Sequence, residues 1–207
     1  MEPITLEGEF VRLEPLRGGH LEDLWAAAQE PDIWRWMPIA VRTRADLEIL
    51  VEEAVAAQAA GRELPFAVVD RASGRAVGST RYLDIDPVNR GLEIGWTWYG
   101  RAHRGGAVNP ESKLLLIRHA FEEWGAIRVF LKTDSRNERS RAAILKLGAR
   151  YEGDLRNHRI RPDGTYRDTS YYSILPDEWP AVRRGLEARI AVYQARRRSA
   201  PESRADR

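Results

Sequence analysis

The sequence predicts one α/β domain built on a mixed, mostly antiparallel sheet that helices flank. Apolar segments with a period of two alternate along the chain with segments whose apolar residues follow the helical period. Three strand-like segments in close succession, joined by short polar turns, favour antiparallel neighbours. No segment has the composition of an interdomain linker, so we expect a single domain over residues 1–198 and a disordered basic tail over residues 199–207.

The composition is that of a globular protein outside the membrane. Hydrophobic residues make up 43% and charged residues 31% of the 207 residues, which leaves enough apolar side chains for one substantial core. No apolar run approaches the ~20 residues that cross a bilayer, and the N-terminus lacks the features of a signal peptide. We therefore expect a cytoplasmic protein without a membrane partner.

Composition also disfavours two other classes of protein. The chain has no cysteine, which excludes disulfides, thiolate metal sites and cysteine nucleophiles. His103 has no histidine or carboxylate cluster near it in the sequence, so no metal site is expected. The formal net charge is only +2, which gives a nucleic-acid partner little electrostatic support although the sequence pI is about 9.0.

The first third of the chain predicts a strand, a short helix and a long helix, at residues 10–16, 20–29 and 43–61. Thr43 is a good N-cap for the long helix, and Gly61 favours its end. Between the two helices, residues 32–38 carry two tryptophans and show no clear period.

The remaining elements are assigned in the same way. Strands are predicted at residues 64–69, 76–83, 92–99, 127–133, 149–156 and 166–175, and helices at 109–124, 137–147 and 178–197. Gly148 lies in the C-terminal position of a helix that favours glycine. A turn at residues 162–164 joins the last two strands.

The most informative stretch is the turn from Arg104 to Asn109, between an aromatic strand and a long helix. The first turn of a helix presents unpaired N–H groups and the positive end of its dipole, which together favour anions. Gly105 and Gly106 have no Cβ atom, so a phosphate can approach the backbone closely. The turn is neither a Walker loop nor a dinucleotide fingerprint. Taken alone, a plain strand-to-helix connection explains it at least as well.

Two stretches together resemble the GNAT superfamily of N-acetyltransferases. The turn is similar to the superfamily's CoA-binding loop: Arg104 takes the first position, Ala107 replaces the central glycine and Asn109 replaces the last small residue. Residues 137–149 are similar to its Asn-x-x-Ser…Lys-x-Gly-Phe helix. The order of elements over most of the chain fits the same fold.

A finer resemblance points to the ribosomal-protein N-terminal acetyltransferase group. It is carried by residues 152–156, by Asp163-Gly164, and by the Val-Asn-Pro-Glu-Ser-Lys stretch at residues 108–113. Relatives of this fold often form dimers, so a homodimer is a further expectation.

The resemblance implies a sheet of about seven strands that splits into a V between its two central strands, where acetyl-CoA inserts. It implies a cofactor pyrophosphate on the glycine turn. The expected cofactor-binding residues are Trp96, Thr97, Trp98, Arg104, Gly105, Gly106, Ala107, Val108, Asn109, Lys113, Asn137 and Ser140. For Lys113, an ion pair with Glu111 or with an aspartate or glutamate of a neighbouring element is an equal alternative to a cofactor phosphate.

Acetyl transfer requires a group that removes a proton from the attacking ammonium. Glu93 is the expected base, because it lies on the strand before the turn, in the register that carries a glutamate base in some members of the superfamily. The alternative is a surface glutamate paired with Arg81 or Arg90.

The departing thiolate requires a proton. Ser140 is the expected acid and Asn137 the expected cofactor contact, although both residues also suit a plain helix start. The tyrosine acid of many members is replaced by Ile144, so that mechanism does not carry over. A water molecule or the amine's own proton is the alternative to Ser140.

The expected acceptor-binding residues are Trp34, Trp36, Met37 and Asp168. The superfamily forms one wall of its acceptor groove in the region of the tryptophans, and the last strand pair forms the other. The aromatic residues could line a channel for the amine or pack the helices onto the sheet. Asp168 could attract a cationic amine or pair with a neighbouring arginine.

We therefore expect an N-acetyltransferase that moves acetyl from acetyl-CoA to a primary amine by direct attack in a ternary complex. The amine is either the N-terminal α-amine of a protein or a small amine. The alternative is a non-catalytic acyl-CoA-binding or regulatory module of the same fold, which the missing glycine and tyrosine motivate. The identity of the acceptor does not follow from the sequence.

Overall fold

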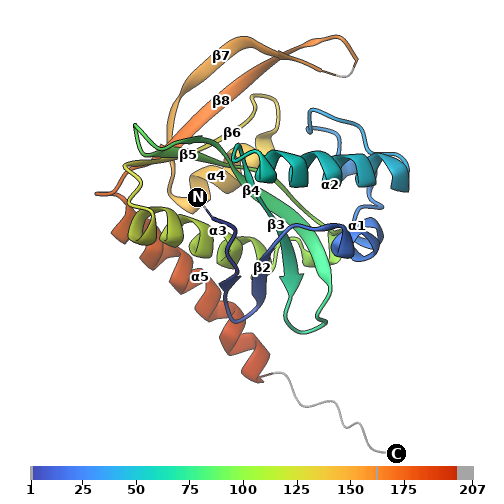
Figure 1. Ribbon diagram of the computed structural model, residues 1–207. Coiled ribbons are helices and arrows are strands. Elements are labelled where there is room, and N and C mark those ends of the chain that lie inside the picture. The colour runs from blue at the N-terminus through green and yellow to red at the C-terminus, as the bar shows by residue number, and fades with distance from the viewer. Residues whose placement is uncertain (1, 162, 200–207) are drawn as a thin grey trace, which may run out of the picture.

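The computed structural model describes residues 2–161 and 163–199, so Pro162 of the predicted turn and the predicted tail from residue 200 onward lie outside the described residues. Within them, eight strands form one sheet in the order β1-β2-β3-β4-β5-β6-β8-β7 (Figure 1). The strands are β1 Leu6–Glu7, β2 Val11–Pro15, β3 Leu64–Asp70, β4 Ala76–Asp86, β5 Gly91–Tyr99, β6 Arg128–Asp134, β7 Arg150–Ile160 and β8 Tyr166–Ile174.

The predicted mixed, mostly antiparallel sheet is confirmed. All neighbouring strands are antiparallel except β5 and β6, which are parallel. The sheet has one strand more than the expected number of about seven. The additional strand is β1, whose two residues are too few to show a period of two in the sequence.

Five α-helices accompany the sheet: α1 Leu21–Ala27, α2 Arg44–Ala59, α3 Val108–Arg118, α4 Glu138–Leu147 and α5 Trp179–Ser199. The predicted caps are confirmed, because Thr43 Oγ1 accepts the N–H of Asp46 and Gly148 adopts a φ of 106°. The helix predicted to reach Trp124 is α-helical only to Arg118 and continues as a π-helical turn at His119–Glu123. No helix in the described ranges is long and apolar enough to cross a membrane.

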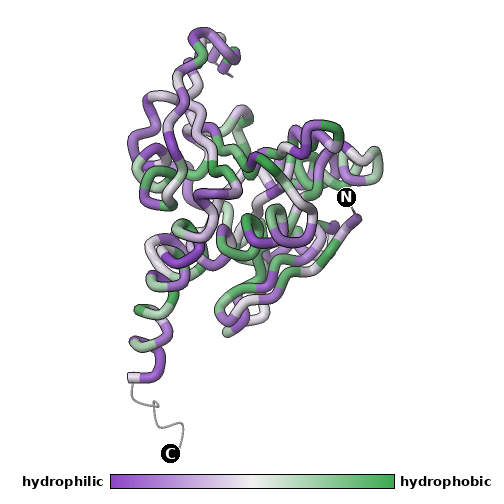
Figure 2. The backbone as a smooth tube through the Cα atoms, turned by 90° about the vertical axis from the view of Figure 1, so that its left-hand side faces the viewer, coloured by the Kyte–Doolittle hydropathy of each residue, from purple (hydrophilic) through white to green (hydrophobic). Residues whose placement is uncertain are grey.

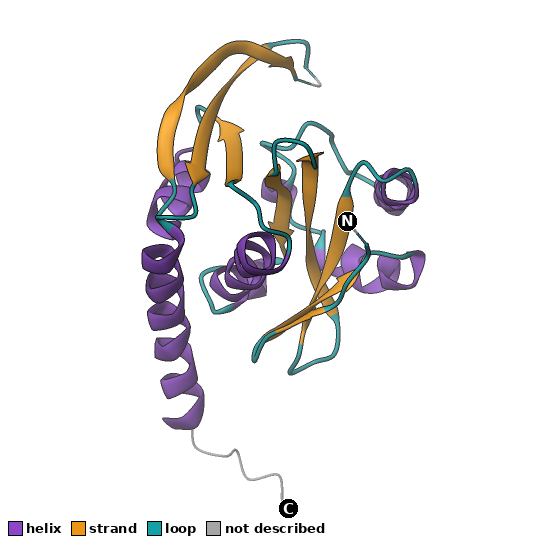
Figure 3. Cartoon of the chain, turned by 60° about the vertical axis from the view of Figure 1, so that its left-hand side comes forward, coloured by secondary structure: helices purple, strands orange, loops and turns teal. Residues whose placement is uncertain are grey.

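Helices cover both faces of the sheet (Figure 3). On one face, α3 and α5 share a core with the strands through residues such as Leu116, Ile117 and Leu186. On the other face, α1 and α2 bury Leu24 and Leu47 against β3 and β5. Figure 2 shows hydrophobic segments through the middle of the molecule and a largely hydrophilic tip of the β7–β8 hairpin at the top.

The two central strands separate soon after they meet, as the predicted split requires. β5 and β6 pair at only three positions, the last of them Glu93 with Phe130. β5 then continues to Tyr99, and β6 continues to Asp134. Where β5 no longer pairs with β6, it still pairs with β4 and contains a bulge. There Trp96 has a φ of 49°, and the register with β4 shifts between Ser79 and Arg81.

A buried carboxylate attaches the N-terminal segment to α3. Glu111 is only 4% exposed, and its two oxygens accept the backbone N–H groups of Glu9, Phe10 and Val11 at 2.8, 2.7 and 2.7 Å. A Cβ atom at Gly8 would overlap the Glu111 side chain, so the chain can approach this closely only with glycine there. The ion pair between Lys113 and Glu111 that was one alternative for Lys113 is not formed, because Lys113 Nζ donates to Thr97 instead.

We predict that Glu111→Gln lowers the free energy of unfolding by about 2 kcal/mol, because the amide places an NH₂ group against N–H donors and removes a charge-assisted acceptor. Urea unfolding followed by circular dichroism measures this loss. Glu123→Gln, at an exposed position, is the control and should stay within ~0.5 kcal/mol of the parent. Equal stability of the two variants would contradict the anchoring role.

Candidate active site

A cavity of about 610 Å³ lies where β5 and β6 diverge, and this volume is within the range of small-molecule sites. Its walls come from β5, β6, the starts of α3 and α4, the segment after α1 and the β7–β8 hairpin. It brings together most of the residues that the sequence predicts for the site: Trp36, Met37, Glu93, Trp96, Thr97, Trp98, Arg104, Gly105, Asn109, Lys113, Asn137 and Ser140.

Five predicted site residues do not line this cavity. Three of them, Gly106, Ala107 and Val108, form the end of the glycine turn and the first residue of α3. Trp34 is buried in the core, where its Nε1 donates to the carbonyl of Ala28 at 3.1 Å. Trp34 therefore packs a helix onto the sheet, which was the alternative to lining the acceptor channel. Asp168 accepts the backbone N–H of Asn157 at 2.7 Å instead of facing the cavity.

We call the part of the cavity lined by β5, the glycine turn and the starts of α3 and α4 the donor half, and it fits a ligand that carries phosphates. Gly105 lines it with a φ of 75°, and a Cβ atom at Gly105 or Gly106 would meet nothing within 4 Å. Arg104 is held by a hydrogen bond from its Nε to the carbonyl of Tyr99 at 2.9 Å. Tyr193 of α5 donates to the carbonyl of Gly105 at 2.8 Å, so the turn is fixed from both sides.

Two helix starts converge on this half. The first residues of α3 follow the glycine turn, and Asn137 caps α4 by accepting the N–H of Ser140 at 3.1 Å. Arg139 in the first turn of α4 also lines the cavity. Burial, and then the repulsion of Arg139, lower the pKa of Arg104 from its ordinary value. An anion between the two arginines would relieve this repulsion. Sequence reasoning missed Arg139, because an exposed arginine on a helix carries no signal of its own.

Glu93 is buried at the bottom of the split and does not pair with Arg81 or Arg90. It is 2% exposed, and its Oε2 lies 2.5 Å from Nζ of Lys132, which also donates to Asp84 at 2.9 Å. Burial raises the pKa of Glu93 to about 7, although Lys132 opposes the shift. A Cβ atom at Gly95 would lie 2.5 Å from Glu93 Oε1, so glycine leaves room beside the carboxylate.

Lys132 is a site residue that the sequence did not reveal. It lies on β6, so its approach to Glu93 depends on the parallel pairing of two strands that are separated by a helix in the sequence. Arg81, which was one expected partner, donates instead to Glu63 at 2.8 Å, with its guanidinium over the ring of Trp96.

A buried amine of α3 lies against β5 beyond Glu93. Lys113 is 6% exposed, and its Nζ donates to Thr97 Oγ1 at 2.7 Å, which in turn meets Thr80 Oγ1 at 2.8 Å. Burial lowers the pKa of Lys113 to about 7, although the charge of Glu93 opposes the shift. Among the ion pairs of the described chain, none involves Lys113. Ile144, at the position where the resemblance implies a tyrosine acid, lines the cavity with an apolar side chain.

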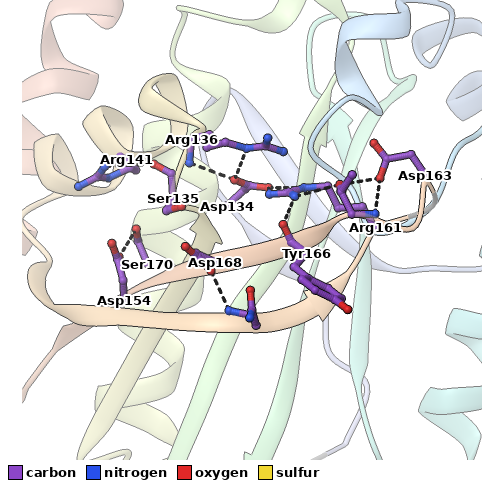
Figure 4. Close-up of polar contacts among 12 residues, drawn as sticks. Asp134, Ser135, Arg136, Arg141, Asp154, Arg161, Asp163, Tyr166, Asp168 and Ser170 are labelled. Atoms are coloured by element: carbon purple, nitrogen blue, oxygen red, sulfur yellow. Dashed lines mark hydrogen bonds and ion pairs between the residues drawn. The ribbon is translucent and has the colours of Figure 1, made fainter.

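The β7–β8 hairpin forms the remaining wall and is fastened to the end of β6. Arg161 donates from Nε and Nη2 to Asp134 Oδ2 at 3.0 and 2.7 Å (Figure 4). Asp134 is 1% exposed, and its other oxygen accepts the N–H of Arg136 at 3.0 Å. Burial by itself would raise the pKa of Asp134, but these bonds lower it below the ordinary value. The clamp holds His158, Arg159 and Arg167 of the hairpin on the cavity.

No group of three or more His, Asp or Glu side chains in the described part of the chain is arranged to hold a metal ion. The cavity does hold ionisable side chains suited to proton transfer. One carboxylate and one amine, each with a pKa near neutrality, face a site with anion-binding helix starts.

The sequence model of the acetyltransferase (GNAT) domain family matches residues 11–150 of this chain. Over 106 residues the chain is 34% identical to the candidate ribosomal N-acetyltransferase YdaF of Bacillus subtilis. That match covers 51% of this chain and 57% of YdaF, so the chain spans little more than half of that relative's length.

Solved structures agree with the domain match. A GCN5-related N-acetyltransferase from Brucella melitensis is 32% identical with a TM-score of 0.85, and the match covers 91% of this chain and 86% of that one. A candidate acetyltransferase from T. thermophilus is 37% identical with a TM-score of 0.83, over 92% of this chain and 98% of that one.

The matched domain contains the split, the glycine turn and the capped start of α4, which are the features that the donor half of the cavity is built from. Acetyl-CoA is the donor that this family uses, and the arginines and helix starts of the cavity fit its phosphates. The chain belongs to the GNAT family of acetyltransferases.

Proposed function

We propose that this protein transfers the acetyl group of acetyl-CoA to a primary amine, most simply the N-terminal α-amine of a protein, by direct attack in a ternary complex. The observation that carries the proposal is Glu93, a buried carboxylate with a pKa of about 7 beside the unpaired stretch of β5. The name of YdaF, a candidate ribosomal N-acetyltransferase, supports a ribosomal protein as the acceptor.

The residues of the donor half have distinct tasks. Arg104, Arg139 and the first N–H groups of α3 and α4 are placed to bind phosphates, and Gly105 leaves the backbone accessible. Beyond Glu93, the unpaired edge of β5 offers backbone groups for hydrogen bonds along the rest of the cofactor. Bound acetyl-CoA supplies an activated thioester, whose acyl carbon accepts the amine and whose thiol departs.

Glu93 accepts the proton that the attacking amine must lose. An α-ammonium has an ordinary pKa near ~8, so a carboxylate with a pKa of about 7 accepts its proton at little cost. Lys132 keeps part of the Glu93 population ionised and fixes the carboxylate. On the donor side, Ser140 and Lys113 both line the cavity and can supply a proton, and at neutral pH Lys113 exists in both protonation states.

We predict that Arg104→Glu weakens acetyl-CoA binding about tenfold or more, because it replaces a phosphate-binding charge by a repulsive one. Isothermal titration calorimetry measures the dissociation constant. Arg184→Glu, on an exposed face of α5 away from the cavity, is the charge-matched control and should bind like the parent. If Arg104→Glu also binds like the parent, the phosphate assignment is wrong.

We predict that kcat/KM for an α-amine acceptor rises as the pH increases through about 7, because Glu93 must lose its proton before it can accept one. Lys132→Met should move this rise in kcat/KM to higher pH, since Lys132 is the group that lowers the Glu93 pKa.

Glu93→Gln should reduce kcat about 10²-fold with acetyl-CoA affinity retained, while exposed Glu53→Gln serves as control.

The assay is amine-dependent release of CoA thiol, with mass spectrometry of the product. Tight acetyl-CoA binding without turnover across peptide and small-amine acceptors would overturn the enzymatic proposal. It would instead support the non-catalytic acyl-CoA-binding alternative.

A further inference from the structure

Two arginines lie directly opposite one another on the β7–β8 hairpin. Arg159 and Arg167 are register partners in the antiparallel pair, and both line the cavity. Side chains at such positions project from the same face of the sheet, and like charges there are destabilising. The hairpin therefore concentrates positive charge on the wall of the cavity that it forms, which we call the acceptor wall.

Among the described residues, no carboxylate around the hairpin forms an ion pair with Arg159 or Arg167. The ion pairs of the hairpin, over its described residues 150–161 and 163–174, join Arg150 to Glu178, Arg161 to Asp134, and Glu152 to Arg128 of β6. None of these involves Arg159 or Arg167. The half-buried Arg167 also has a buried Nε without a hydrogen-bond acceptor among the described residues.

The surroundings of Arg167 show the cost of this arrangement. Burial lowers the pKa of Arg167. The charges of Asp134 and Glu93 oppose this shift, and those of Arg161 and Arg159 add to it. The neighbouring His158 also lines the cavity, and its pKa is lowered first by burial and then by Arg159, Lys132 and Arg167. Because no ion pair of the described residues includes Arg159 or Arg167, a bound anion would add a direct partner to the longer-range compensation from Asp134 and Glu93.

The fold holds these arginines in place through a bulge. The register shifts between Leu155 and Arg159, and Asn157 adopts a φ of 49°. The carboxylate of Asp168 accepts the Asn157 N–H at 2.7 Å and stabilises the bulge (Figure 4). Asp168 is thus a positioning residue for the acceptor wall, although it does not face the cavity itself.

The arginine pair shares its cavity with the base. The charge of Glu93 acts on Arg167, and Trp36 and Met37 line the cavity as apolar groups. We propose that Arg159 and Arg167 form a subsite for a carboxylate that lies a few bonds from the reacting amine of the acceptor. This inference rests on the proposed function and narrows it to acceptors that carry a carboxylate close to their amine.

The carboxylate can belong to an acidic side chain near a peptide N-terminus or to the α-carboxylate of a free amino acid. Two pairs of acceptors distinguish these sources: the peptide amides Ser-Glu-Gly and Ser-Gln-Gly, and free serine against serinamide. For the parent protein, we expect the KM of one carboxylate member to be about tenfold below that of its amide partner, with similar kcat. The absence of a preference in both pairs overturns the subsite.

Variants test whether the arginines cause the preference. Arg167→Gln should abolish it, and Arg167→Glu should reverse the peptide preference toward Ser-Lys-Gly amide. Arg156→Gln, at an exposed position of the same hairpin outside the cavity, is the matched control and should retain it. Arg167→Gln should unfold at the parent's temperature or above, because it removes like-charge repulsion. If Arg167→Glu does not fold, Arg159→Gln replaces it and should also weaken the preference.

Calorimetric binding of the same acceptors in the presence of CoA separates this inference from the proposed function. Preferential binding of the carboxylate members without acetylation of any amine would leave the subsite standing and overturn the enzymatic proposal. Acetylation of amide and carboxylate acceptors with equal KM would overturn the subsite and leave the enzymatic proposal standing.

Discussion

Backbone pairing between β5 and β6 ends after three residue pairs, and the organisation of the site depends on that loss. Each strand then has an edge whose N–H and C=O groups lack a partner strand, which is costly unless water or a ligand satisfies them. The separation creates the cavity, and the bulge at Trp96 lies within the unpaired part of β5. Because β5 leads to α3 and β6 leads to α4, two helix starts converge on the same opening.

The split also accounts for the unusual burial of charge. Glu93 and Lys113 both have pKa values moved to about 7 by desolvation, so each carries a free-energy cost in its charged form. Glu111 shows the contrasting case on the same helix as Lys113. Its carboxylate is similarly buried, but three backbone N–H groups satisfy it, and its role is to hold the N-terminal segment. Burial alone therefore does not identify a reactive group; the partners do.

The β7–β8 hairpin forms the other half of the site, and contacts between residues that are distant in the sequence hold it in place. Asp134 and Arg161 fasten it to the end of β6, and Asp168 stabilises the bulge that precedes Arg159. These contacts join residues that are 27 and 11 positions apart in the sequence. The donor half, in contrast, is built largely from consecutive residues of one strand–turn–helix unit, which explains why motif resemblance located it and did not locate the acceptor half.

The sequence by itself determined the mixed sheet, the order and approximate bounds of its main elements, and the caps at Thr43 and Gly148. It also predicted the residues that line the donor half of the cavity. These features rest on local periodicity, helix-end chemistry and short contiguous motifs. Only the tertiary structure decided that Trp34 packs in the core while Trp36 lines the cavity, and that Lys132 accompanies Glu93. The same holds for Arg139 and for the facing of Arg159 and Arg167. The physical reason is that a side chain's environment depends on strand pairing and register between distant segments, which local patterning does not specify.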